Sequence, residues 1–363
     1  MSGQIKRILT LDGGGILGLF SLQILGEIER IFRQHRQKND LVLGEVYDFI
    51  GGTSTGAIIA AGLSWGLSVA ELKKLYLDYG QRMFSRERFH LRWKSKYRAE
   101  HLASMFREIF HEDGQPALLS SQKLKTLLLV VMRNATTGSP WPVCNNPQAR
   151  FNDPSLPDCN LNIPIWKLLR ASTAAPTFFP PEEIMLGTSR YVFVDGGITP
   201  YNNPSLISVL MATLPEYRIN WPCGVKQLHV TSVGVGGVKS KMRKQIAKSI
   251  HLGDQFSFMI PALIDSVKLE QDMLCRVLGK CLHGTELDLE LGTLSGAGIL
   301  PEEEKKFSYV RYDSPLDDHI CKTGASPDLR ISLDNLELMP LLQEAGLSYA
   351  KETVDPTHLL LED

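Results

Sequence analysis

The stretch Val46-Tyr47-Asp48-Phe49-Ile50-Gly51-Gly52-Thr53-Ser54-Thr55-Gly56-Ala57-Ile58-Ile59-Ala60-Ala61-Gly62 decides the fold. Its first part is apolar and β-prone, and its last part is small, apolar and compatible with a helix. Between them, Gly52-Thr53-Ser54-Thr55-Gly56 matches G-x-S-x-G, which at a strand-to-helix turn forms a nucleophile elbow. Because so tight a turn leaves no room for side chains two residues either side of the serine, Gly52 and Gly56 are expected to be obligatory.

The rest of the chain supports an α/β fold. Strands alternate with helices, and this alternation predicts a largely parallel sheet covered by helices on both faces. The last third is more helical, with a late strand expected over residues 309–312, and residues 136–162 are expected to form a loop rich in proline and asparagine. The other predicted strands span residues 7–11, 46–50, 127–132, 191–194 and 228–235, and the main helices span residues 19–37, 69–79, 99–111, 254–279 and 335–350.

Composition excludes several classes of protein. The 363 residues are 43% hydrophobic and 22% charged with a net charge of −1, so neither a nucleic-acid polymer as partner nor an extreme surface charge is indicated. No apolar run is long enough for a transmembrane helix, and the N-terminus does not resemble a signal peptide. We therefore expect a cytoplasmic protein whose six scattered cysteines are reduced thiols.

Three features carry chemistry. A serine hydroxyl needs a base, and Asp195 follows a predicted strand and precedes two glycines, which would hold its carboxylate at the edge of the sheet. Gly13-Gly14-Gly15 precedes a helix, and its unhindered N–H groups could stabilise an oxyanion. The alternatives are an ordinary turn at Asp195 and a phosphate cradle at the glycines, although Gly18-Leu19-Phe20 lacks the Gly-Lys-Ser/Thr of a P-loop.

Histidine is the usual base of a serine triad, so the histidines are the competing candidates. His229 lies inside a predicted buried strand, where a structural role is expected. His251, His283 and His319 lie in polar contexts without a recognisable active-site setting. A triad stays open, but the sequence does not indicate one.

Taken together, the motifs resemble those of the patatin-like phospholipase family. They are Asp12-Gly13-Gly14-Gly15-Ile16-Leu17-Gly18, the elbow around Ser54, residues 170–176, Asp195-Gly196-Gly197 and Asn202-Asn203-Pro204, in this order. The resemblance implies a three-layer α/β/α fold with a mostly parallel central sheet. It also implies a catalytic core over residues 5–240 and a mainly helical C-terminal extension over residues 241–363, packed on the core.

The same resemblance implies roles for individual residues. Ser54 would be the nucleophile and Asp195 the base of a Ser-Asp dyad that works without a metal or another cofactor. Gly13, Gly14 and Gly15 would supply oxyanion donors, with Gly14 and Gly15 the stronger candidates. Leu17 occupies a position at which the family often has Arg or Lys. Since an aspartate in water is a weak base at neutral pH, we also expect a desolvated Asp195 with a raised pKa.

Residues 82–98 alternate basic and aromatic side chains, including Arg86, Arg88, Arg92 and Trp93. This pattern is compatible with a solvated surface, with peripheral contact to a membrane, and with a pocket for a phosphate-bearing regulator.

The predicted function is hydrolysis of fatty acyl esters in membrane glycerophospholipids. The resemblance extends to bacterial antiphage effectors that a cyclic dinucleotide activates, so such an activator is a candidate partner. The alternatives are a constitutive lipid acyl hydrolase or esterase and a non-catalytic lipid-binding module. A homo-oligomer stays open.

Overall fold

The computed structural model describes residues 4–83, 99–237, 252–295, 300–316, 319 and 332–361. Within these residues, nine strands form one sheet in the order β10-β11-β9-β1-β2-β5-β8-β7, with β6 also paired to β5. The strands are β1 (Lys6–Leu11), β2 (Phe49–Thr53), β5 (Leu127–Asn134), β6 (Ser139–Cys144), β7 (Glu182–Leu186), β8 (Ser189–Asp195), β9 (Leu228–Val233), β10 (Lys280–His283) and β11 (Ser308–Tyr312). β3 (His111–Glu112) and β4 (Gln115–Pro116) form a separate small hairpin.

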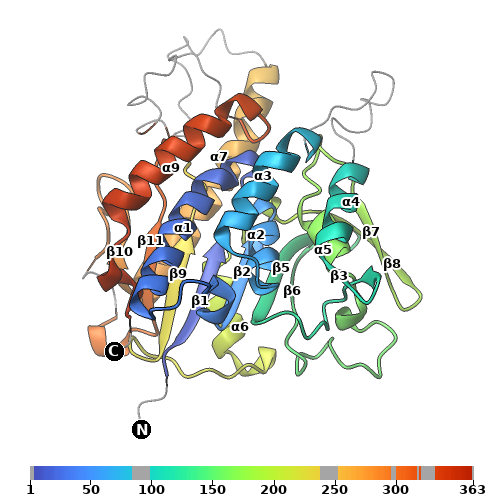
Figure 1. Cartoon of the computed structure of the whole chain (residues 1–363), viewed down its shortest axis with the longest axis horizontal. Helices are drawn as coiled ribbons and strands as arrows, with labels where there is room; N and C mark the ends of the chain where they lie inside the picture. Colours follow the sequence, from blue (N-terminus) through green and yellow to red (C-terminus); the bar gives the residue numbers. More distant parts are fainter. Residues whose placement is uncertain are drawn as a thin grey trace.

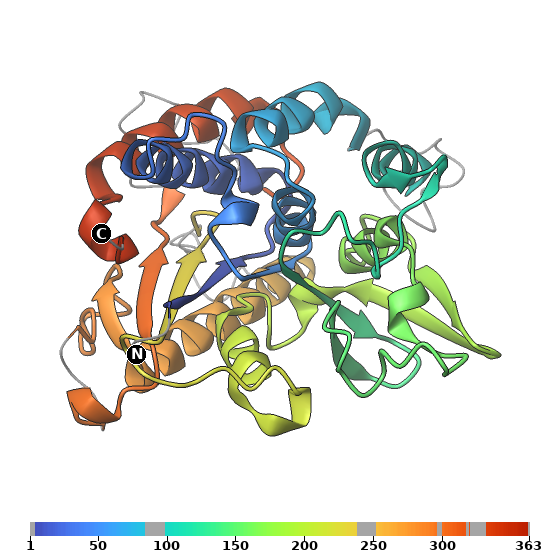
Figure 2. The same cartoon turned by 60° about the horizontal axis from the view of Figure 1, so that its bottom comes forward.

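The sheet is parallel from β10 to β5 and antiparallel beyond it. Helices cover both of its faces, as Figure 2 shows. The helices are α1 (Gly18–His35), α2 (Thr55–Ser64), α3 (Val69–Met83), α4 (Ala99–Ile109), α5 (Ile165–Ser172), α6 (Ser205–Thr213), α7 (Leu252–Leu278) and α9 (Met339–Thr353). The predicted three-layer α/β/α fold with a mostly parallel sheet is confirmed.

Alternation along the strands divides the core in two. In β5, Leu128 and Val130 face a large cluster shared with helices α1 to α5 and α9, whereas Leu129 and Val131 face a smaller cluster shared with α6. Successive side chains of a strand point to opposite faces, so one buried strand supplies both layers. Figure 1 shows α9 running alongside α1 on the larger layer.

One expectation about local structure was wrong, and one strand was not predicted. The predicted loop over residues 136–162 contains β6, whose Pro140 and Pro142 pair with Arg133 and Val131 of β5. Proline has no N–H to donate to a strand ladder. Because an edge strand pairs along only one of its two sides, β6 can accommodate Pro140 and Pro142. Strand β7, paired only with β8 in the described sheet, was not predicted.

The C-terminal part completes the sheet as well as one helical layer. β10 and β11 extend the parallel sheet beyond β9, and the predicted late strand over residues 309–312 is confirmed as β11. The predicted boundary at residue 240 lies outside the described residues, so the division into a core and an extension stays a prediction. Among the described helices, none combines the length and the apolar character needed to cross a bilayer.

Candidate active site

Strands β2 and β8 meet end to end along one edge of β5. Thr53, the last residue of β2, pairs with Val131, and Asp195, the last residue of β8, pairs with the adjacent Met132. Because β6 occupies the other edge of β5 from Leu129 to Asn134, β2 and β8 must share the remaining edge. One strand is parallel to β5 and the other antiparallel, so their ends converge and bring Ser54 and Asp195 together.

Ser54 lies at the N-terminus of α2 in a backbone conformation that is unusual for a side-chain-bearing residue. Its φ is 53° and its ψ is −121°, as expected of the serine in a nucleophile elbow. The Ser54 N–H donates a 2.9 Å hydrogen bond to Ser172 Oγ, and Ser172 Oγ donates in turn to the Val131 carbonyl at 2.6 Å. Ser172 thus ties the elbow to β5, which stabilises the strained conformation.

The Ser54 hydroxyl donates a 2.7 Å hydrogen bond to Asp195 Oδ2. The Gly197 N–H donates to the other carboxylate oxygen, Oδ1, at 2.6 Å. Asp195 is only 5% exposed, and burial raises its pKa from 3.8 to about 6, although the Gly197 and Ser54 hydrogen bonds and the charge of Arg170 oppose this shift. The expected desolvated Asp195 with a raised pKa is confirmed. A carboxylate with this pKa is a stronger base than one in water and is still mostly ionised at neutral pH.

The glycines of the elbow allow β1, β2 and α2 to approach closely. A Cβ on Gly52 would lie 2.2 Å from the Gly56 carbonyl oxygen, and one on Gly56 would lie 2.3 Å from the Leu11 carbonyl oxygen. Both neighbours are backbone atoms of the core and cannot move aside. The expectation that Gly52 and Gly56 admit no side chain is confirmed.

Gly56→Ala should lower the free energy of unfolding by about 3 kcal/mol, because α2 must move away from the end of β1. Urea denaturation measures the change. Gly26→Ala in α1 is the matched control, because its new Cβ would meet only the flexible end of Lys73, 2.8 Å from Nζ. That control should be neutral or stabilising by up to about 1 kcal/mol, as Gly-to-Ala changes inside helices are. Equal destabilisation by the two substitutions would contradict the close-approach explanation.

The glycine loop after β1 lies directly against Ser54. A Cβ on Gly13 would lie 3.2 Å from Ser54 Cβ. The Gly13 N–H donates to the Asn202 carbonyl at 3.2 Å, so this amide is already engaged. Neither the Gly14 N–H nor the Gly15 N–H donates a hydrogen bond to another described residue. Among the described residues the Gly14 and Gly15 amides therefore have no hydrogen-bond acceptor, and their role as oxyanion donors stays a prediction.

The other side of this loop is covered by the C-terminal part of the chain. The Ile16 N–H donates to the Leu333 carbonyl at 2.9 Å, and a Cβ on Gly15 would lie 2.4 Å from that carbonyl oxygen. Gly15 has a φ of 58°, a conformation that favours glycine. Leu17 is buried in the core, so a cation at this position would have to be accommodated among apolar side chains.

The structure brings together Ser54, Asp195 and the glycine loop, as the sequence predicted. It also adds residues to which the sequence reasoning gave no role: Ser172, Arg170 and the Asn202 carbonyl. Their motifs were recognised only as part of the family resemblance, because each acts through contacts between distant segments. The predicted membrane or regulator contacts, Arg86, Arg88, Arg92 and Trp93, lie outside the described residues, and their role stays a prediction.

His229 has a structural environment. It is fully buried in β9, its Nδ1 lies 2.9 Å from Ser308 Oγ, and burial lowers its pKa to about 3. The hydrogen-bond partner of Ser54 Oγ is the carboxylate of Asp195. The expectation of a structural role for His229 is confirmed.

Comparison with known proteins finds a matching family model and several relatives. A family model described as patatin-like phospholipase matches residues 9–207, which include the glycine loop, the elbow and Asp195. A cGAMP-activated phospholipase of Escherichia coli (strain TW11681) is 31% identical over 240 residues, 64% of this chain and 62% of that protein. A cGAMP-activated phospholipase of Vibrio cholerae is 32% identical over 247 residues, 63% of this chain and 64% of that protein.

Plant proteins are also similar. Patatin-T5 of Solanum tuberosum is 26% identical over 254 residues, 64% of this chain and 61% of that protein. The chain thus spans less than two thirds of the length of each of these three relatives. The resemblance inferred from the motifs is confirmed: the chain belongs to the patatin-like phospholipase family, a family of hydrolases.

Proposed function

We propose that this protein hydrolyses fatty acyl esters of membrane glycerophospholipids, with Ser54 as nucleophile and Asp195 as general base. The observation that carries the proposal is the 2.7 Å hydrogen bond from Ser54 Oγ to the buried Asp195 carboxylate, on a strained elbow beside the glycine loop. Membership of a phospholipase family supports lipid esters as the substrate class.

The first half-reaction forms an acyl-enzyme. Ser54 Oγ attacks the ester carbonyl carbon while Asp195 Oδ2 accepts the hydroxyl proton. The negative charge that develops on the carbonyl oxygen is stabilised by the Gly14 and Gly15 N–H groups and by the N-terminus of α2. When the tetrahedral intermediate collapses, the ester C–O bond breaks and Asp195 returns the proton to the leaving lysolipid oxygen.

The second half-reaction releases the fatty acid. Water attacks the acyl carbon, Asp195 accepts its proton, and the bond from the acyl carbon to Ser54 Oγ breaks. Ser54 then recovers the proton from Asp195, and the site returns to its starting state. The Gly197 N–H holds the Asp195 carboxylate in place through both steps because it binds the oxygen that does not face Ser54.

We also propose that a cyclic dinucleotide activates this hydrolysis. It is supported by two relatives of this chain, at 31% and 32% identity, that are cGAMP-activated phospholipases. An antiphage role and peripheral contact with a membrane belong to the same proposal, and a constitutive enzyme is the alternative to it. One experiment distinguishes a gated from a constitutive hydrolase.

The purified protein and its Ser54→Ala variant are incubated with vesicles of mixed bacterial phospholipids, with and without a panel of cyclic nucleotides that includes cGAMP. Mass spectrometry measures free fatty acids and lysolipids. We expect release by the wild type only, rising steeply with one cyclic nucleotide. Equal release without any nucleotide would contradict gating, and vesicle binding without release would support a lipid-binding module and contradict hydrolysis.

A further inference from the structure

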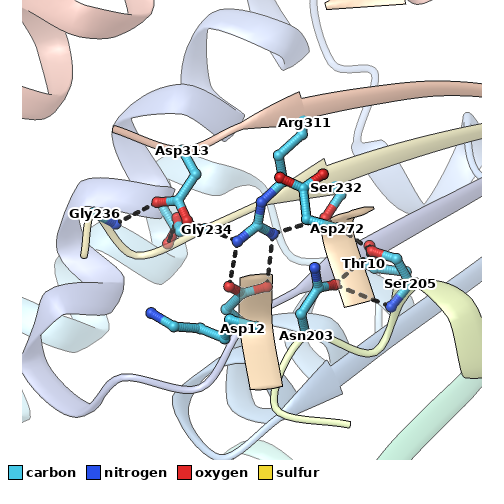
Figure 3. Close-up of polar contacts among 12 residues, drawn as sticks. Thr10, Asp12, Asn203, Ser205, Ser232, Gly234, Gly236, Asp272, Arg311 and Asp313 are labelled. Carbon is cyan, nitrogen blue, oxygen red and sulfur yellow. Dashed lines mark hydrogen bonds and ion pairs between the residues drawn. The ribbon is translucent and has the colours of Figure 1, made fainter. Parts of the chain in front are cut away.

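A buried arginine joins the C-terminal strand β11 to the start of the glycine loop. Arg311 on β11 is 2% exposed, and Asp12, directly before Gly13, is 1% exposed. The guanidinium group binds both carboxylate oxygens of Asp12, with Nη1 to Oδ1 at 2.8 Å and Nη2 to Oδ2 at 2.6 Å (Figure 3). β11, β9 and β1 are adjacent and parallel, so their ends lie at the same edge of the sheet. The paired geometry fixes both the position and the orientation of Asp12.

The same arginine also fixes the segment that packs on Gly14. Arg311 Nη2 donates to Asp313 Oδ2 at 2.7 Å, and Asp313 Oδ1 accepts a 3.0 Å hydrogen bond from the Gly236 N–H. The neighbouring Val235 lies against the glycine loop, since a Cβ on Gly14 would come within 2.6 Å of its side chain. Arg311 therefore holds Gly14 from two sides, through Asp12 and through the turn that carries Val235.

A third connection reaches Gly13. Arg311 Nη1 donates to Ser232 Oγ at 2.8 Å, and the Ser205 hydroxyl lies 2.9 Å from Ser232 Oγ and 2.6 Å from Asn203 Oδ1. Figure 3 shows these side chains as one connected group below Arg311. The residue before Asn203, Asn202, accepts the Gly13 N–H at its carbonyl. The network thus connects Arg311 to Gly14 through the turn that carries Val235, and to Gly13 through the segment that carries Asn202.

Charge gives the pair a second effect on the site. Burial raises the pKa of Asp12, and Arg311 opposes that shift. An unpaired, ionised Asp12 would place a negative charge immediately before the amides proposed to stabilise an oxyanion, where it would repel that oxyanion. Lys268, itself buried, adds favourable charge near Asp12 and Asp313 without a direct hydrogen bond to either among the described residues.

We propose that Arg311 is a positioning residue for hydrolysis at Ser54: bound to Asp12 and Asp313, it holds the glycine loop where the Gly14 and Gly15 amides meet the oxyanion, and it neutralises the adjacent carboxylate. The inference rests on the proposed function. It predicts that loss of Arg311 lowers kcat far more than it changes KM, because the oxyanion exists only after attack begins.

The test compares Arg311→Met and Arg311→Lys with Arg276→Met. Arg276 is the matched control because it is also fully buried and binds both carboxylate oxygens of one aspartate, Asp272, at 2.9 and 2.6 Å. Its described hydrogen bonds go to Asp272 and to the carbonyls of Thr285 and Thr293, none of which belongs to the glycine loop. All variants are assayed well below their Tm, with and without the panel of cyclic nucleotides, on a soluble p-nitrophenyl acyl ester and by the rate of phosphonylation with a fluorophosphonate.

We expect Arg311→Met to lower kcat and the phosphonylation rate about 10²-fold, because a small displacement of the oxyanion donors has an effect of this size. KM should stay within about threefold of the wild-type value. Arg311→Lys keeps the positive charge but cannot bind both carboxylate oxygens of Asp12 in the same way, so its kcat should be about tenfold higher than that of Arg311→Met. It gives a second measurement if the methionine variant does not fold. Arg276→Met should lower Tm but leave kcat within about twofold to threefold, since it removes no contact of the glycine loop.

The outcomes separate the two proposals. If the wild type hydrolyses the ester in a Ser54-dependent way and the Arg311 variants keep the kcat of Arg276→Met, the role of Arg311 is wrong and the proposed function stands. If the wild type shows no Ser54-dependent hydrolysis or phosphonylation with or without any of the cyclic nucleotides, the proposed function is wrong and the role of Arg311 falls with it.

Discussion

Ser54→Ala should lower kcat/KM for acyl esters by about 10⁴-fold or more, because it removes the hydroxyl that faces Asp195. The other two elbow hydroxyls, of Thr53 and Thr55, are buried and hydrogen-bonded to the Tyr201 carbonyl and the Tyr76 hydroxyl. The substitution removes one oxygen atom and its 2.7 Å hydrogen bond to Asp195. It keeps the backbone turn, since the Ser54 N–H still reaches Ser172 and the flanking glycines are unchanged. The variant should therefore fold normally and still bind lipid vesicles as the wild type does.

Ser208→Ala is the control for the loss of a buried serine hydroxyl. Ser208 lies in α6 and donates a 2.7 Å hydrogen bond to the Pro204 carbonyl. This control should keep kcat/KM within about twofold while losing about 1 kcal/mol of stability. Initial rates on a soluble ester and on phospholipid vesicles measure both variants. Full activity of Ser54→Ala would show that another residue is the nucleophile.

Asp195→Asn should have two opposite effects, lower activity and higher stability at neutral pH. An asparagine cannot accept the Ser54 proton, so kcat/KM should fall by about 10³-fold.

In the wild type, kcat/KM should rise about tenfold per pH unit below pH 6 and level off above it, because Asp195 has a pKa of about 6 and must be ionised to act.

The stability effect follows from the same pKa. Since folding raises the pKa of Asp195 from 3.8 to about 6, the folded state binds the proton more tightly, and the wild type loses stability as the pH rises between these values. A shift of this size corresponds to about 3 kcal/mol above pH 6, and Asp195→Asn avoids that loss. Denaturant unfolding should show that the free energy of unfolding of Asp195→Asn, relative to that of the wild type, increases from pH 4 to pH 7. A constant difference across this range would contradict a raised pKa for Asp195.

The elbow could be predicted from the sequence because its requirements are local. A serine flanked at two residues on either side by glycine, between an apolar strand and a small-residue helix, specifies the turn without knowledge of the rest of the chain. The glycines at 52 and 56 then follow from steric crowding, which the distances to backbone atoms confirm. The parallel part of the sheet follows from strand-helix alternation.

The partnership of Ser54 with Asp195 depends on non-local information. It requires that β8 run antiparallel to β5 and share an edge of β5 with β2, so that residues 141 positions apart meet. The position of β6 on the other edge of β5 contributes to this, and its two prolines hid it from a propensity-based prediction. The pairing of Asp195 with Ser54 was therefore inferred from the family resemblance, and periodicity could not have supplied it.

The Arg311 network illustrates the same limit. Arg311 and Asp12 are 299 positions apart, and a charged residue inside a short apolar strand gives no sign of its partner. Only the alignment of β11 beside β9 and β1 places the guanidinium group at the start of the glycine loop. Sequence patterns predicted the strand that carries Arg311 but not the function of its side chain.

Labelling with a fluorophosphonate followed by peptide mass spectrometry is the sharpest test of Ser54 as the nucleophile, because this reagent reacts preferentially with a serine activated by a base and an oxyanion site. We expect a single phosphonylated residue, Ser54, with labelling lost in Ser54→Ala and slowed in step with hydrolysis in Asp195→Asn. Ester hydrolysis that persists while Ser54 stays unmodified, or a label on a different serine, would contradict it.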